Sequence, residues 1–149
     1  MYSDIVTLFN RYESRSGDLW YPTVLKGVDL NIDKAAILAK YGPETNDTAR
    51  IHVKYHTENG VVRVGDKIWL PPKEWEEQTN DVMPKSITFT DGTAFDFVWA
   101  GEWTDGIVKD ADFLPDGFYT YMNKHYDNVF AVSSVAKYSV IPHFELLLR

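Results

Sequence analysis

The sequence predicts a mainly β protein, a partly closed antiparallel barrel or a sandwich of about six to nine short strands with roughly one to three short helices. Two observations carry this prediction. Short runs of alternating apolar residues recur along the chain, separated by Gly, Pro, Asn and Asp, which favour turns. Five Trp, nine Tyr and eight Phe add large side chains, whose burial can hold a small β core together without cross-links.

Length and composition indicate a single domain spanning residues 1–149. A chain of this size can bury roughly two-thirds of the surface that it exposes when unfolded, and no repeat or linker divides it. It contains no cysteine, which excludes disulfides, thiolate metal sites and a cysteine nucleophile. We infer a compartment that is reducing or indifferent to redox state.

The charge of the chain disfavours two classes of partner. A net charge of -7 and an isoelectric point near 5.0 give no long-range attraction to nucleic acid or anionic lipid. The 15 basic residues are scattered singly, so we expect no sequence-specific nucleic-acid binding. The N-terminal residues lack the basic start of a signal peptide, and no apolar run approaches the roughly 18 residues of a membrane span. These features predict a soluble protein with no membrane partner.

Residues 5–12 fit a helix or a strand, and we predict a strand. The turn cluster at residues 14–18 leads into a second β-rich run, residues 19–25, as in a hairpin. Pro22 in that run predicts an edge position, because proline cannot donate to a ladder. The competing helical spacing is that of Ile5, Leu8, Phe9 and Tyr12.

A short helix is predicted from Asp33 to Tyr41, which has a capping residue, alanines and a following Gly42-Pro43. An extended segment stays open there, because helices of this length depend on tertiary packing. Residues 50–55 then alternate as a strand. The following Asn59-Gly60 supplies left-handed turn residues that would pair this strand with residues 61–64.

The next segments alternate between turns, strands and one short helix. Gly65-Asp66 marks a turn before a short strand over residues 67–70, and residues 73–77 predict a helix with proline at its start. Asp91-Gly92 predicts a type I′ hairpin, because both central residues of that turn need a positive φ. The runs that it would join carry apolar residues on one face each: Ile87 and Phe89 in the first, Phe95, Phe97 and Trp99 in the second.

The last part of the chain predicts a polar loop over residues 101–117, a short helix from residue 117 or 118 to His125, and two strands. After a bend near residues 137–139, the final strand would place one set of residues on the buried face. Leu147 falls on the wetter face, so this strand is either buried on both sides or covered by a neighbouring subunit. We therefore expect an assembly contact here. The residues on the buried face would be Val140, Phe144, Leu146 and Leu148.

Candidate metal and catalytic residues have little support from spacing. On a strand, His52 and His56 would lie about 13 Å apart, too far to share an ion. His125 and His143 stand alone, without a nucleophile motif. The acidic loop from Asp110 to Asp116 resembles the start of a calcium loop but lacks the completing glutamate, so we interpret it as solvated acids and leave weak calcium binding open. We assign no catalytic, cofactor or metal residue.

The tryptophans could line the core or form a stacking platform, and strand alternation favours the core. Trp103 is less constrained, because it follows Gly101 near the polar loop, and could anchor an interface if exposed. The four residues considered for a platform are Trp69, Trp75, Trp99 and Trp103.

Five segments spread over nearly the whole chain carry a family resemblance: residues 5–12, 20–28, 71–75, 126–135 and 142–144. They resemble a family of small phage and prophage proteins encoded among the virion assembly genes of siphoviruses, whose members look like head-tail connector or head-completion proteins. The resemblance implies a non-enzymatic virion structural protein that forms a homo-oligomeric ring and contacts other virion proteins by strand pairing or loop docking.

Such a protein would reside in the virion and, during assembly, in the cytoplasm of the bacterial host. The acidic balance fits a channel wall that does not retain passing DNA. Two other classes stay open. A carbohydrate- or ligand-binding β module would need two or more exposed aromatic residues on a concave surface. A small hydrolase would need His125 or His143 within hydrogen-bond reach of an acid or nucleophile.

Overall fold

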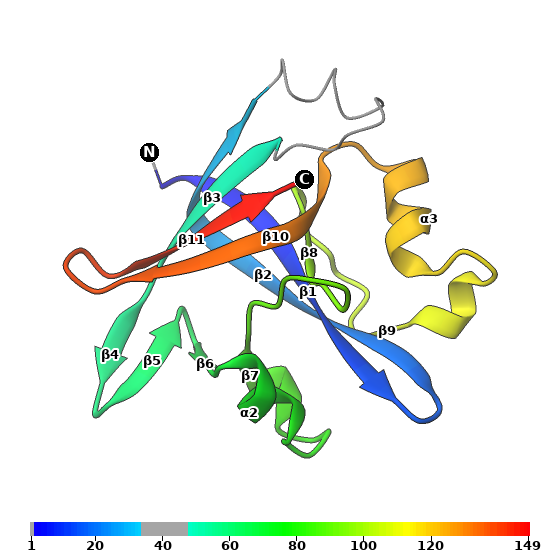
Figure 1. Ribbon diagram of the computed structural model, residues 1–149, viewed down its shortest axis with the longest axis horizontal. Coiled ribbons are helices and arrows are strands. Elements are labelled where there is room, and N and C mark those ends of the chain that lie inside the picture. Colours follow the sequence, from blue (N-terminus) through cyan, green and yellow to red (C-terminus); the bar gives the residue numbers. More distant parts are fainter. Residues whose placement is uncertain (1, 34–47) are drawn as a thin grey trace.

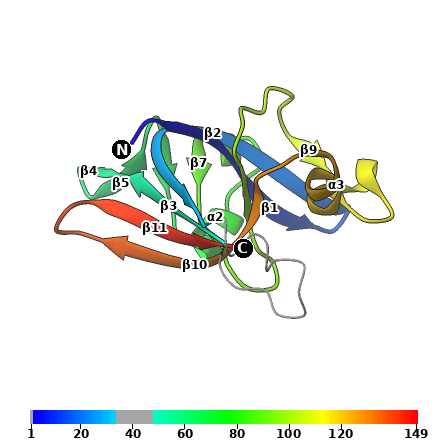
Figure 2. The same cartoon turned by 90° about the horizontal axis from the view of Figure 1, so that it is seen from above.

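The computed structural model describes residues 2–33 and 48–149 and is mainly β, as predicted. It is built on a closed six-stranded antiparallel barrel, in which β2 pairs with β1 to complete the circle. Figure 1 shows this barrel at the centre of the molecule and Figure 2 shows it from above. The strands follow each other around it as β1 (Asp4–Ser14), β8 (Phe97–Trp99), β10 (Val129–Tyr138), β11 (His143–Leu148), β3 (Ala49–Lys54) and β2 (Gly17–Ile32).

A second, four-stranded sheet and the helices lie outside the barrel wall. The sheet contains β4 (His56–Glu58), β5 (Val61–Val64), β6 (Lys67–Trp69) and β7 (Ser86–Ile87). The elements between β6 and β7 are helix α2 (Pro72–Glu76) and the 3₁₀ turn η1 (Met83–Lys85). After β8 come β9 (Val108–Lys109), which extends the large sheet on β2, the 3₁₀ turn η2 (Asp110–Phe113) and helix α3 (Phe118–His125).

The first hairpin confirms the strand predicted for residues 5–12. β1 and β2 pair along their length around a turn at Arg15 and Ser16. The helix-like spacing arises because both faces of β1 are buried. Leu8 faces the barrel interior, whereas its neighbour Phe9 packs outside the wall against α3.

Pro22 lies at an open edge, as predicted. On the side away from β1, β2 pairs with β9 at Leu19 and Trp20 and with β3 only from Asp29 onward. Pro22 falls in the stretch between these two pairings, where its missing backbone N–H leaves no hydrogen bond to a neighbouring strand unmade.

The structure contradicts the hairpin predicted at Asp91-Gly92. β7 pairs in parallel with β6, whereas β8 lies between β1 and β10, so the two runs belong to different sheets. Gly92 has a positive φ of 87°, but Asp91 does not, and the type I′ turn therefore does not form. Backbone and side-chain hydrogen bonds between Thr90 and Asp96 close the loop instead and direct the chain into the barrel.

The turn at Asn59-Gly60 forms as predicted, with φ of 53° and 78°, but its partner was assigned wrongly. It joins β4 to β5, and the strand predicted at residues 50–55 is β3 in the barrel wall. The two strands are separate because Tyr55 is buried and its N–H donates to the carbonyl of Pro142 (3.4 Å).

Other local predictions agree with the structure. β6, α2 and α3 lie close to the residues predicted for them, and Gly65-Asp66 forms the turn between β5 and β6. The loop at residues 101–117 is more structured than expected, because it contains β9 and η2. The segment predicted as a helix or extended chain from Asp33 to Tyr41 lies outside the described residues after Asp33.

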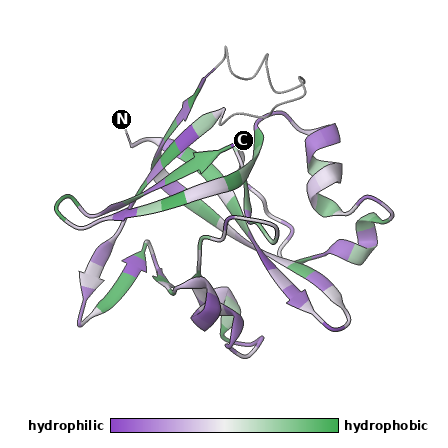
Figure 3. Cartoon of the chain, in the orientation of Figure 1, coloured by the Kyte–Doolittle hydropathy of each residue, from purple (hydrophilic) through white to green (hydrophobic). Residues whose placement is uncertain are grey.

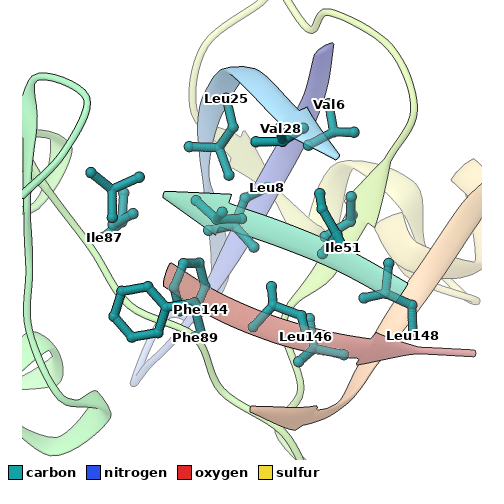
Figure 4. Packing of buried hydrophobic residues seen from close by; sticks show 14 of the residues in the cluster. Val6, Leu8, Leu25, Val28, Ile51, Ile87, Phe89, Phe144, Leu146 and Leu148 are labelled. Carbon is teal, nitrogen blue, oxygen red and sulfur yellow. The ribbon is translucent and has the colours of Figure 1, made fainter. Parts of the chain in front are cut away.

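Hydrophobic residues line the barrel strands, whereas α2 is mostly polar (Figure 3). Alternate residues of β11 are fully buried: Phe144, Leu146 and Leu148. Figure 4 shows these side chains close to residues of β1 and β3 within one core cluster. Ile87 and Phe89, from the region of the small sheet, join the same cluster, so this sheet covers part of the barrel core.

The C-terminal strands form as predicted, but the turn between them lies at residues 139–142. Val140 therefore does not join the buried face of β11; it stands in the turn and is 95% exposed. β10 continues to Tyr138 because the carbonyl of that residue accepts a hydrogen bond from Tyr55 Oη (2.8 Å). β11 pairs with β10 on one edge and β3 on the other, so it cannot offer an edge to a neighbouring subunit.

We expect Phe144→Ala to lower the free energy of unfolding by about 3–5 kcal/mol, because the substitution leaves a cavity in the barrel core. Leu147→Ala, on the partly exposed face of the same strand, is the matched control and should cost much less. Urea denaturation followed by tryptophan fluorescence measures both values. Equal losses would contradict the placement of β11.

Candidate functional site

The tip of the β10–β11 hairpin is the clearest surface candidate. The hairpin projects from the barrel at one end of the molecule, and its turn is hydrophobic (Figures 1 and 3). Val140 is 95% exposed and Ile141 74% exposed. We call residues 139–142 the hairpin tip. Two large aliphatic side chains at a projecting turn gain free energy from being covered by another surface.

The base of the hairpin is held by contacts with β3 and within the hairpin itself. Tyr55, directly after β3, donates from Oη to the carbonyl of Tyr138 at the end of β10 and from its N–H to the carbonyl of Pro142 in the tip. The Tyr138 and His143 rings stack with centroids 4.8 Å apart, and His143 Nδ1 lies 2.7 Å from the carbonyl oxygen of Ile141. These contacts fix the direction in which the tip projects.

Basic side chains flank the hairpin tip. The ammonium group of Lys137 lies 5.4 Å from the ring centroid of Tyr55 and 5.6 Å from that of Trp69. Lys54, whose register partner on β11 is His143, lies over the Tyr2 ring at 4.3 Å. Cation–π contacts of this kind hold the charges near the barrel surface. The tip is therefore apolar with basic surroundings, in a chain whose net charge is -7.

The acidic loop from Asp110 to Asp116 has a structural role at the other end of the molecule. Asp110 Oδ1 accepts hydrogen bonds from Trp20 Nε1 and from the backbone N–H of Phe118, both at 2.9 Å. Gly117 has φ of 90°, and a Cβ there would meet Asp110 Oδ2 at 3.1 Å. Asp110 thus fixes the start of α3 against the barrel, a role that the calcium-loop resemblance did not predict.

A pocket of about 410 Å³ lies between this loop and α3. Leu114 is 67% exposed beside it, and the Phe113 and Tyr121 rings face each other with centroids 4.7 Å apart. Asp116 pairs with Lys124 at 3.1 Å. We call this hollow the α3 pocket. Its lining residues are Asp112, Phe113, Leu114, Pro115, Asp116, Tyr121, Lys124 and His125.

A larger cavity of about 720 Å³ follows the open edge of β2, between residues 22–28 and the chain from β3 to β6. Lys67 Nζ donates a hydrogen bond to Thr23 Oγ1 (2.7 Å) across it. Burial lowers the pKa of Lys67. Tyr55 is the aromatic residue among those lining the cavity, and its side chain is largely buried, so the cavity offers no pair of exposed rings for stacking.

The four histidines do not converge on one site, although the His52 and His143 rings lie with centroids 5.6 Å apart. His52 Nε2 lies 2.9 Å from Glu145 Oε2 and its Nδ1 lies 3.6 Å from Asp29 Oδ2. His56 is on β4, in the other sheet. His125 Nδ1 lies 2.8 Å from the carbonyl oxygen of Tyr121, and His143 Nδ1 lies 2.7 Å from the carbonyl oxygen of Ile141. Across residues 2–33 and 48–149, no group of three or more His, Cys, Asp or Glu could hold a metal ion.

The structure confirms that the tryptophans considered for a platform pack into hydrophobic clusters. Trp75 is fully buried against Tyr21, and Trp69 packs on Phe144. Trp99 and Trp103 are partly buried beside Phe9 and α3. These side chains belong to three separate clusters, so they do not make one stacking surface.

Asp96 is a buried carboxylic acid whose pKa is strongly raised. Its carboxylate is fully buried and accepts N–H groups from Arg11 (2.9 Å), Thr90 (2.7 Å) and Asn10 Nδ2 (2.9 Å). Burial raises its pKa to about 7, although these hydrogen bonds favour the ionised form. Asp96 lines neither the α3 pocket nor the cavity along β2, and its hydrogen bonds tie the chain before β8 to β1.

The exposure of the hairpin tip was missed because Val140 and Ile141 are β-branched, which favours a strand. The sequence did hold a signal for a turn here, because only a few residues separate the two C-terminal runs of alternating residues. An antiparallel pair needs a turn there, and Pro142 ends the possible ladder.

The fold and surface define a closed β barrel with a projecting apolar hairpin. The chain belongs to DUF6751, a family of unknown function, which matches residues 1–147. No curated protein and no solved structure matches the chain. No helix in the described ranges is long and apolar enough to cross a membrane.

The raised pKa of Asp96 predicts that the free energy of unfolding falls as the pH rises from about 4 to about 7. Its pKa is higher in the folded protein than the value of about 3.9 in an unfolded chain. At low pH, Asp96 is protonated in both the folded and the unfolded protein. As the pH rises, the unfolded protein loses this proton first, and the folded protein loses stability, by on the order of 4 kcal/mol above pH 7.

Urea unfolding at pH 5 and pH 8 measures this contribution. Asp96→Asn should lose this pH dependence. It should also be less stable than the wild type at pH 5, because its NH2 group, which cannot accept, replaces one of the two oxygens at which N–H groups donate to Asp96. Other titrating groups contribute to both proteins alike. The same pH dependence of stability in the wild type and in Asp96→Asn would contradict the raised pKa of Asp96.

Proposed function

We propose that the protein is a non-enzymatic structural protein that acts by self-assembly, as a head-tail connector or head-completion component of a phage or prophage. The exposed apolar hairpin tip is the observation that carries the self-assembly part of this proposal. The virion setting rests on the resemblance of residues 5–12, 20–28, 71–75, 126–135 and 142–144. The protein would then act in the virion and, during assembly, in the cytoplasm of the bacterial host.

The geometry of the tip supports assembly through side chains. A projecting, rigidly based turn can enter a hollow on another subunit, whereas β11 itself has both edges occupied within the barrel. The strand pairing expected at the terminal strand is therefore replaced by loop docking in this proposal. Ring formation requires that each subunit use two different surfaces.

A ligand-binding β module is the second candidate, and the cavity along the open edge of β2 favours it. A volume of about 720 Å³ lies in the range of small-molecule sites. Lys67 would supply a polar contact, because its ammonium group lies at Thr23 in the cavity wall. Lys67→Ala should remove ligand binding and leave self-association unchanged, which separates the two functions.

We expect the double variant Val140→Asp with Ile141→Asp to weaken self-association by about 100-fold or more. Each side chain loses an apolar contact worth roughly 1.5–3 kcal/mol and gains a charge that resists burial. Sedimentation velocity over a concentration series measures the shift toward monomer. Val82→Asp, an exposed apolar position elsewhere, is the control and should associate like the wild type. Unchanged association of the tip variant would exclude the tip from the interface.

A further inference from the structure

We propose that copies of the protein associate head to tail, with the hairpin tip of one copy seated in the α3 pocket of the next. This inference rests on the proposed self-assembly and names its two surfaces. The occupant of the pocket is thus a second copy of this chain, through Val140 and Ile141.

The two surfaces lie at opposite ends of the molecule. Figure 1, drawn with the longest axis horizontal, places the β10–β11 hairpin at the left end and α3 with η2 at the right end. Figure 2 shows the same separation from above. A contact between two different surfaces leaves one of each free on the growing assembly. It therefore propagates and closes into a ring where the rotation between subunits allows.

The two surfaces are complementary in hydrophobic character. The hairpin tip offers two exposed aliphatic side chains, and the α3 pocket offers Leu114 together with the Phe113 and Tyr121 rings. The pocket volume of about 410 Å³ lies in the range of sites that enclose small ligands. Docking would cover Val140, Ile141 and Leu114, which are the three most exposed of the large hydrophobic residues described.

Charge favours this pairing over contacts between like ends. Lys54 and Lys137 flank the hairpin tip, whereas Asp112 and Asp116 stand at the α3 pocket. Lys124 also lines the pocket and pairs with Asp116, so the net negative charge of the pocket comes from Asp112. A basic tip attracts an acidic pocket and repels a second basic tip, so the charges select head-to-tail association over a symmetric tip-to-tip dimer.

A contact made by one turn in one pocket is small and weak on its own. Closing a ring makes the last contact intramolecular, and the effective concentration of its two surfaces then exceeds that of free subunits. The closed ring would therefore be more stable than an open chain of the same subunits.

Cysteine cross-linking tests the proposal in the full-length chain, which has no cysteine of its own. A variant carrying both Ile141→Cys and Leu114→Cys should form a ladder of disulfide-linked multimers on mild oxidation. Each single variant should stay monomeric under denaturing, non-reducing electrophoresis. A mixture of the two single variants should give dimers and nothing larger, because each chain then has one reactive end. Ile141→Cys combined with Val82→Cys is the matched control and should give no ladder.

Charge exchange provides a second readout that does not require oxidation. Lys137→Glu should weaken association of the otherwise unchanged chain, and Asp112→Lys should do the same. In a mixture of the wild type with either variant, a mixed pair can form in two orientations. One of them brings the exchanged charge against a like charge, and the other uses two unchanged surfaces. The chain carrying both exchanges should recover part of the association, because the charges at positions 137 and 112 are again opposite in sign.

The outcomes separate the inference from the function on which it rests. Two results would overturn the head-to-tail contact and leave self-assembly standing. One is disulfide-linked dimers of Ile141→Cys alone, and the other is a wild type that assembles while the double-cysteine variant gives no ladder. A wild type that stays monomeric at every concentration would overturn both. Tip-dependent binding to phosphatidylglycerol vesicles by such a monomer would assign the tip to a lipid surface instead.

Discussion

The buried carboxylate of Asp96 holds together the point at which the chain enters the barrel. It accepts N–H groups from Asn10 and Arg11 on β1 and from Thr90 in the preceding segment. The backbone carbonyl of the same residue accepts the N–H of Val132 on β10. β8, which follows directly, is only three residues long and bridges β1 and β10. Closure of the barrel therefore depends on a polar cluster as well as on the apolar core.

Closure of the barrel decides which parts of the chain can meet a partner. Every barrel strand has a neighbour on both sides over at least part of its length, and β11 is paired along both edges. Barrels protect strand edges in this way, so a contact made by the β10–β11 hairpin must use the side chains of its turn. The β10–β11 hairpin extends beyond the wall and presents two apolar side chains there. Contacts with Tyr55 and the stacked Tyr138 and His143 rings fix the base of this hairpin, which is why we propose the turn as a contact.

Local sequence patterns predicted most of the elements, because their causes are local. The first hairpin, α3 and the two C-terminal strands follow from alternation and turn residues close in the chain. The hairpin at Asp91-Gly92 was wrong because Asp96 forms bonds to residues more than 80 positions away in sequence. No local pattern records such a partner.

The candidate surfaces were harder to predict than the fold for a similar reason. An apolar side chain in a short β-rich segment reads as core, and only the closed barrel shows that Val140 and Ile141 lie beyond it. The acids from Asp110 to Asp116 suggested solvated loop residues, whereas Asp110 fixes α3 and its neighbours line a pocket. The role of Asp110 depends on where Trp20 and Phe118 come to lie in the folded chain, whereas Asp112 and Asp116 are exposed.

We propose that the apolar turn on this closed barrel drives assembly of the chain into rings. Negative-stain electron microscopy of the concentrated wild-type protein, with class averages of the particles, tests it most directly. Head-to-tail assembly should give closed rings with one repeating subunit orientation. Particles that are only monomers, or symmetric dimers joined at like ends, would contradict it.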